Sequence, residues 1–164
     1  FLMALLGMLQ IAPLWLALIC ARGADPRLLF ILLSTIWIAD SAAYFAGKNF
    51  GKNKLAPTIS PGKTWEGVFG ALLAVTLFAG VLHLWFDVNN MAVFPLLWMV
   101  ALFGVIGDLF ESLMKRQANI KDSGDLLPGH GGILDRIDGL IPSLPIGIMA
   151  IYAYNYAVVT GVVR

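Results

Sequence analysis

The stretch GLIPSLPIGIMAIYAYNYAVVTGVV, residues Gly139–Val163, contains 25 residues without a single charge. A helix needs about 20 apolar residues to cross the ~30 Å hydrocarbon core of a bilayer, so this run is long enough to span a membrane. Its apolar residues are continuous rather than alternating, which favours a helix over a strand of a β-barrel. The stretch therefore predicts a helical integral membrane protein.

Four earlier apolar runs each predict another transmembrane helix: Phe1–Ala21, Leu28–Ala46, Gly67–Phe86 and Met91–Gly107. The last run is short, and we expect its helix to continue into the polar segment that follows. The expected fold is all-α, with about five transmembrane helices in a single membrane domain over residues 1–164. Because the chain opens within apolar sequence, we expect it to be the C-terminal part of a longer protein.

The composition agrees with a membrane protein. Hydrophobic residues make up 59% of the 164 residues and charged residues 13%, with a mean hydropathy of +0.82. Soluble domains carry about 25% charged residues, so an ordinary soluble globule and a basic nucleic-acid binder are excluded. The single cysteine, Cys20, excludes an internal disulfide and a cysteine metal site.

The basic residues predict the orientation in the membrane. Three of them, Arg22, Arg27 and Arg164, fall on one side of the predicted spans. The positive-inside rule makes the richer side cytoplasmic. That side carries the other eight, which are Lys48, Lys52, Lys54, Lys63, Lys115, Arg116, Lys121 and Arg136.

Two polar segments on the predicted cytoplasmic side are the candidate catalytic segments, residues 40–67 and 108–138. The second carries six carboxylates and four cations, a net charge of −2. Within it, Asp108, Ser112 and Lys115 are spaced to share one face of a helix. Carboxylates can hold Mg²⁺, and cations bind phosphoryl oxygens. The four lysines and one glutamate of residues 48–66 give +3, so we predict that the two segments form one metal and phosphate site.

The spacing of these residues is specific. The longest motif reads Ser112-Leu-Met-Lys115-Arg116, then Lys121-Asp122, His130-Gly131-Gly132 and Asp135-Arg136-Ile-Asp138. Two shorter motifs are residues 40–48, DSAAYFAGK, and residues 60–67, SPGKTWEG. Together they resemble the motifs of the phosphatidate cytidylyltransferase family, also called CDP-diacylglycerol synthases. Gly62 departs from the family, which often has lysine there, so no cationic role is carried over to it.

The resemblance implies that the cytidylyl group of CTP is transferred to phosphatidate, giving CDP-diacylglycerol and pyrophosphate. It implies Mg²⁺, leaves a second cation open, and implies a homodimer in the bacterial inner membrane with its active site facing the cytoplasm. Both substrates are anions, so charge neutralisation and positioning are what the reaction needs. The attacking phosphate is already ionised at neutral pH, so His130 is given no role as a base.

The candidate residues fall into three roles. The resemblance and the charge pattern together give as catalytic candidates Asp108, Asp135, Lys115, Arg116 and Asp138. The candidate metal ligands among them are Asp108, Asp135 and Asp138. The candidate substrate-binding residues are Lys63, Ser112, Lys121, Asp122, His130, Gly131, Gly132 and Arg136.

Structural alternatives stand beside these roles. Asp135 and Arg136 could form an ion pair, and Ser112 could bond its own helix backbone. Glu66 could simply favour the positive start of a helix that Ser60 or Thr64 caps. Asp40 could be the buried partner of Lys48 or of another lysine. The basic pair Lys115-Arg116 could anchor the chain at the membrane surface, and a similar role is open for Lys121 and Asp122.

One further interpretation, a P-loop, is rejected, and two others, a different lipid enzyme and a transporter, remain open. Gly62-Lys63-Thr64 is not taken as the end of a P-loop, because Pro57 stands where glycine is needed and no strand is expected before it. A CTP-dependent polyprenol or dolichol kinase would use similar groups. A transporter could line an ion path with Asp40, Asp108 and Asp135, but charges gathered in one loop favour an enzyme.

Overall fold

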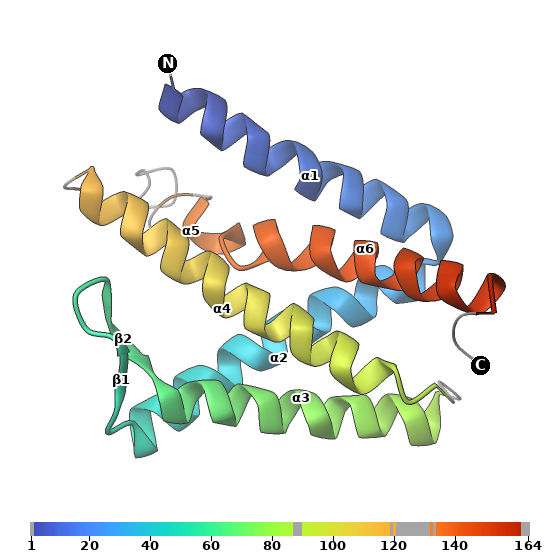
Figure 1. Cartoon of the computed structure of the whole chain (residues 1–164). Coiled ribbons are helices and arrows are strands. Elements are labelled where there is room, and N and C mark those ends of the chain that lie inside the picture. Colours follow the sequence, from blue (N-terminus) through green and yellow to red (C-terminus); the bar gives the residue numbers. More distant parts are fainter. Residues whose placement is uncertain (1, 87–89, 119, 121–131, 133, 162–164) are drawn as a thin grey trace.

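The computed structural model describes residues 2–86, 90–118, 120, 132 and 134–161, with side chains from residue 11 onward. These residues form two helices, then a β-hairpin, and then four further helices (Figure 1). The elements are α1 (Leu2–Ala24), α2 (Pro26–Phe50), β1 (Lys54–Ala56), β2 (Ser60–Thr64), α3 (Trp65–Trp85), α4 (Val93–Gln117), α5 (Leu134–Ile137) and α6 (Leu140–Val159).

The helical membrane architecture is confirmed. Among the described residues, four segments are long and apolar enough to cross a bilayer: α2, α3, α4 and the run Leu134–Val159. As expected, α4 continues beyond its apolar part, to Gln117. The first expected span corresponds to α1, whose described apolar part, Ile11–Ala24, is shorter than the other four.

The bundle buries alanine and branched aliphatic side chains, whereas many of its aromatic side chains are exposed. Its buried core includes Ala39, Ala71, Ala79 and Ala101, together with larger residues such as Leu97. Many large apolar side chains are exposed instead, among them Phe30, Trp37, Leu77, Met149 and Tyr156. This is the pattern expected where hydrocarbon replaces water, because large apolar groups can then face the solvent at no cost.

The connection between α2 and α3 corrects one expectation. No strand was expected before Gly62, but Ser60–Thr64 forms β2 and pairs antiparallel with β1. The register joins Lys54 to Thr64 and Ala56 to Ser60. Ser60 therefore lies in a strand, and it is Thr64 that caps α3, accepting a hydrogen bond of 3.1 Å from the Gly67 amide.

The same end of the bundle carries the hairpin, the last turns of α4 and the short helix α5 (Figure 1). Close contact between α4 and the start of α6 depends on Gly107. A Cβ atom built on Gly107 would lie 2.5 Å from the carbonyl oxygen of Asp138 and 2.7 Å from Cγ of Pro142. The missing side chain thus lets the backbone around Asp138 approach the turn of α4 that carries Asp108.

Gly107→Ala should therefore destabilise the bundle by about 1–3 kcal/mol, the usual cost of overpacking. The measurement is the thermal unfolding midpoint in detergent. The matched control is Gly104→Ala on the same helix, where the new Cβ would lie 3.9 Å from the carbonyl oxygen of Gly139, an ordinary contact. Equal midpoints for the two variants would contradict the close approach at Gly107.

Candidate active site

Two ion pairs define the polar end of the bundle. The first joins the hairpin to α4: Lys63 Nζ lies 2.7 Å from Asp108 Oδ2, across 45 residues of sequence. The same ammonium group donates to the carbonyl oxygen of Val105 at 3.4 Å. Both charged side chains are 24% exposed, so water and substrate can reach them. The structure thus brings the two polar segments of the sequence together.

The second ion pair joins α4 to α5. Lys115 Nζ lies 2.7 Å from Asp135 Oδ1 and 3.1 Å from Glu111 Oε1. The other oxygen of Asp135, Oδ2, accepts a hydrogen bond of 2.8 Å from the Gly132 amide. Asp135 therefore holds both Lys115 and the backbone of Gly132, a residue that the sequence assigns to substrate binding.

Further carboxylates surround the first ion pair. Asp138 accepts a hydrogen bond of 2.8 Å from the Gly139 amide, and it interacts electrostatically with Asp108 and Glu111. Asp40, from α2, interacts electrostatically with Asp108 and Lys63. Among the described lysines, Lys63 is thus the one that acts electrostatically on Asp40, without an ion pair between them, whereas Lys48 Nζ lies 5.7 Å from the centre of the Tyr44 ring.

Glu111 is a site residue that the sequence reasoning did not include. Its side chain is buried, its Oε1 lies 3.1 Å from Lys115 Nζ, and it also interacts with Asp135. In sequence it looks like half of an ordinary helical ion pair with Lys115, four residues later. Its spacing of three residues from Asp108 was the available signal, because it places both carboxylates on one face of α4.

The site carries a negative excess. Around the two ion pairs, two ammonium groups, Lys63 and Lys115, stand against five carboxylates, and the exposed cations Arg116 and Arg136 lie on α4 and α5 but are not counted with them; the carboxylates are Asp40, Asp108, Glu111, Asp135 and Asp138. The formal sum of these charges is −3. Such a field repels an anionic nucleotide, and all five acidic groups offer the hard oxygen ligands that Mg²⁺ prefers. The donor chemistry therefore fits a divalent cation.

The predicted metal ligands are not gathered around one point. Among the described residues, no three or more His, Cys, Asp or Glu side chains are grouped as a metal-ion ligand set. Asp108 and Asp138 interact with each other, whereas Asp135 is turned towards Lys115. Glu111 lies between the two arrangements, since it interacts with both Asp135 and Asp138.

The remaining predicted residues fall into two groups. Arg116 is exposed and donates from Nε to the carbonyl oxygen of Ile59 at 3.4 Å, so it contacts the hairpin. Ser112 is half-buried on α4, and Arg136 is exposed on α5. The other four predicted residues, which lie outside the described part of the chain, are Lys121, Asp122, His130 and Gly131.

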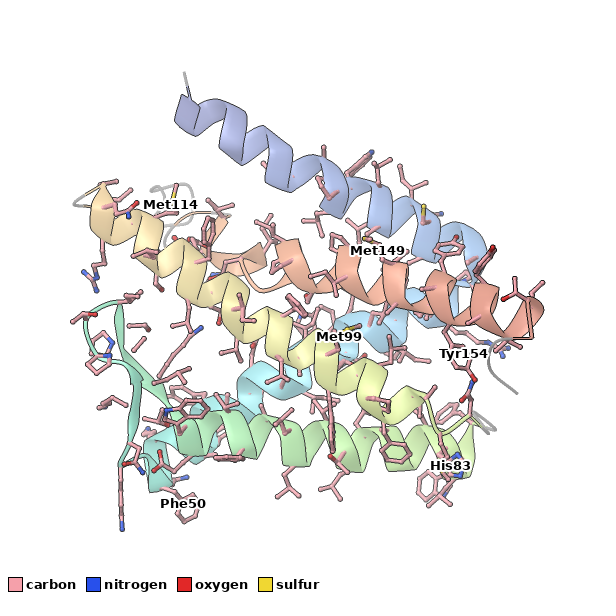
Figure 2. The ribbon with its side chains drawn as sticks, in the orientation of Figure 1. Phe50, His83, Met99, Met114, Met149 and Tyr154 are labelled. Atoms are coloured by element: carbon pink, nitrogen blue, oxygen red, sulfur yellow. The ribbon has the colours of Figure 1, made fainter. Side chains whose placement is uncertain are left out.

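An apolar cavity of about 430 Å³ lies at the opposite end of the bundle, lined by parts of α2, α4 and α6. Tyr154, at its edge, accepts a hydrogen bond of 2.8 Å from Asn90, and His83 lies at the same end of the bundle (Figure 2). The lining residues carry no charge. The cavity therefore lacks what a nucleotide needs, and the ion-pair end remains the candidate site.

Comparison with known proteins agrees with these motifs. Residues 1–154 match the profile of the cytidylyltransferase family. The phosphatidate cytidylyltransferase of Pseudomonas aeruginosa is 42% identical over 156 residues, which cover 92% of this chain and 58% of that protein. The corresponding protein of Haemophilus influenzae is 46% identical over 127 residues, covering 71% of this chain and 44% of that one.

The chain spans about half the length of the curated relatives it matches. A solved structure described as an intramembrane enzyme for archaeal membrane lipid biosynthesis shares the fold, with a TM-score of 0.56 and 24% identity. That match covers 73% of this chain and 75% of the other. The match over 154 residues and the identities above 40% show that the chain belongs to the cytidylyltransferase family.

Proposed function

We propose that the full-length protein transfers the cytidylyl group of CTP to phosphatidate, giving CDP-diacylglycerol and pyrophosphate. The observation that carries the proposal is the pair of lysine–carboxylate contacts, Lys63–Asp108 and Lys115–Asp135, at one end of a membrane bundle. The polar end of a membrane-spanning bundle lies at the membrane surface, where a water-soluble nucleotide can reach the phosphate group of a lipid. The names of the bacterial relatives agree with this reaction.

The reaction forms a bond between a phosphatidate oxygen and the α-phosphorus of CTP, while the bond to pyrophosphate breaks. Such a displacement needs positioning and charge stabilisation rather than a strong base. Lys63 and Lys115 can bind phosphoryl oxygens as point charges. Their carboxylate partners hold the two ammonium groups in place, so little side-chain freedom is lost when substrate binds.

Mg²⁺ is part of the proposal, with a second cation left open. When bound, the ion neutralises phosphate charge and helps the pyrophosphate leave. Asp108 and Asp138, which interact with each other, would hold it; Asp135, which contacts Lys115 in this structure, is the third proposed ligand, and Glu111 interacts with both Asp135 and Asp138. The excess of carboxylates over ammonium groups around the two ion pairs supports this proposal, because CTP would otherwise meet acidic side chains.

The proposed setting is the bacterial inner membrane, with the ion-pair end facing the cytoplasm and two copies forming a homodimer. The eight basic residues that the sequence assigns to the side of Lys63 and Lys115, against three that it assigns to the other side, support the orientation. The bacterial relatives support the type of membrane. The homodimer is carried over from the family resemblance alone.

Membranes that contain the full-length protein should convert labelled CTP and phosphatidate into lipid-linked cytidine when Mg²⁺ is present. Thin-layer separation of the extracted lipid measures the product. A parallel reaction with a polyprenol acceptor separates the kinase interpretation, which predicts a phosphorylated lipid without cytidine. Absence of lipid-linked cytidine from a folded, inserted protein would overturn the proposed function.

Asp135→Asn should lower turnover by about 10²–10³-fold, the loss typical when one preorganised electrostatic contact is removed from an active site. The change weakens the hold on Lys115 while it keeps the size of the side chain. Asp25→Asn is the control, because Asp25 caps α2 at the end of the bundle away from the hairpin. Full activity of Asp135→Asn would remove Asp135 from the catalytic residues.

Chelation by EDTA should abolish activity, and added Mg²⁺ should restore it. Asp108→Asn should raise the Mg²⁺ concentration for half-maximal rate by about tenfold or more, because one charged ligand is lost. The control is again Asp25→Asn, measured over the same Mg²⁺ series. An unchanged Mg²⁺ requirement in Asp108→Asn would show that Asp108 is not a ligand.

A further inference from the structure

Glu66 and Asn53 close the base of the hairpin. The Asn53 amide donates to both carboxylate oxygens of Glu66, at 3.1 and 3.2 Å, and Asn53 Nδ2 donates to Oε1 at 2.8 Å. In return, the Trp65 amide donates to the carbonyl oxygen of Asn53 at 3.0 Å. Four hydrogen bonds thus join the residue before β1 to the first turn of α3. We name this set the Asn53–Glu66 clamp.

The clamp lies directly beside the lysine of the first ion pair. Lys63 belongs to β2, whose last residue, Thr64, is followed at once by Trp65 and Glu66. The hairpin itself is short, with a three-residue strand, a five-residue strand and an irregular register between Lys54 and Ala56. A hairpin of this size is marginally stable alone. The position of Lys63 therefore depends on what holds the two ends of the hairpin together.

Among the described residues, a hydrogen bond from α4 holds the other end of the hairpin, in addition to the contact between Lys63 and Asp108. There Arg116 donates to the carbonyl oxygen of Ile59 at 3.4 Å, a long bond from an exposed side chain. The hydrogen bonds of the clamp are shorter, and three of them go to a charged acceptor, which makes them stronger than neutral ones. The clamp is therefore a stronger restraint on the hairpin than the Arg116 contact, and it acts beside the ion pair of Lys63 itself.

We propose that Glu66 is a positioning residue: through Asn53 it fixes the base of the hairpin and so places the Lys63 ammonium group beside Asp108. Its effect on catalysis rests on the proposed function, whereas its effect on the hairpin does not. The competing explanation is that Glu66 only balances the positive end of the α3 dipole. The two explanations differ in whether the effect of Glu66 requires Asn53 and Lys63.

A double-mutant cycle tests the coupling in the full-length protein. Glu66→Ala should lower kcat/KM for CTP by roughly 10-fold to 100-fold, as expected when hydrogen bonds to a charged group are lost. In a Lys63→Met background, the same change should alter the residual rate by less than about twofold. An equal effect in both backgrounds, or no effect in either, overturns the proposal.

Two milder variants separate the clamp from the helix dipole. Glu66→Gln keeps one oxygen that can accept from Asn53, so it should retain more activity than Glu66→Ala. Asn53→Ala leaves the charge of Glu66 in place but removes the 2.8 Å bond, so it should also lower kcat/KM. A normal rate in Asn53→Ala together with equal losses in Glu66→Gln and Glu66→Ala would support the dipole and overturn the clamp.

Hydrogen exchange gives a test that needs no activity. Glu66→Ala should raise the exchange of the amides between residues 53 and 66 by at least about tenfold, as expected when restraining hydrogen bonds are lost. Asp25→Ala is the matched control, because Asp25 also accepts a backbone hydrogen bond, from the Arg27 amide at 2.8 Å, but away from the hairpin. Unchanged exchange in Glu66→Ala overturns the clamp even if the enzyme assay fails for the wild type.

Discussion

The contact between Lys63 and Asp108 is the interaction on which the rest of the polar end depends. Near hydrocarbon, an isolated charge is costly, so charged groups in a membrane protein are found in pairs or facing water. Here the partner of a helical carboxylate comes from a hairpin 45 residues away in the sequence. The pair therefore joins the polar hairpin to α4, a helix that is long and apolar enough to span the membrane.

Backbone geometry makes this arrangement possible. The start of α6 approaches α4 closely only because Gly107 has no side chain, and that approach brings Asp138 within electrostatic reach of Asp108. The same turn of α4 leads on to Glu111 and then Lys115, which faces α5. The hairpin, α5 and the start of α6 thus all approach α4, and Lys63 and Lys115 lie among the carboxylates there.

The membrane architecture could be predicted from the sequence because a segment that crosses hydrocarbon must be long, apolar and helical, so that its backbone polar groups are hydrogen-bonded internally. The charge-free run after Gly139 and the continuation of α4 past Gly107 are examples. The hairpin escaped prediction because KNKLAPTISPGKT shows no alternation of apolar and polar residues. Nothing local in that stretch indicates pairing, which is completed by Glu66 and by the start of α3.

Site residues were predictable as a set, but their partners were not. The motif spacing pointed to Asp108, Lys115 and Asp135, yet which lysine meets Asp40 depends on how α2 and the hairpin pack. Glu111 was missed because a glutamate four residues before a lysine is common on helix surfaces. Only the fold shows that its carboxylate is buried between Asp135 and Asp138.

The distribution of small and large side chains has a consequence for how such a protein can vary. At lipid-facing positions such as Trp37 and Leu77, any bulky apolar residue serves, because lipid adapts its shape to the surface. At inner positions such as Ala39 and Ala71, volume is limited by the neighbouring helix. Over many generations, the outer surface can therefore drift in sequence while the inner surface keeps its shape.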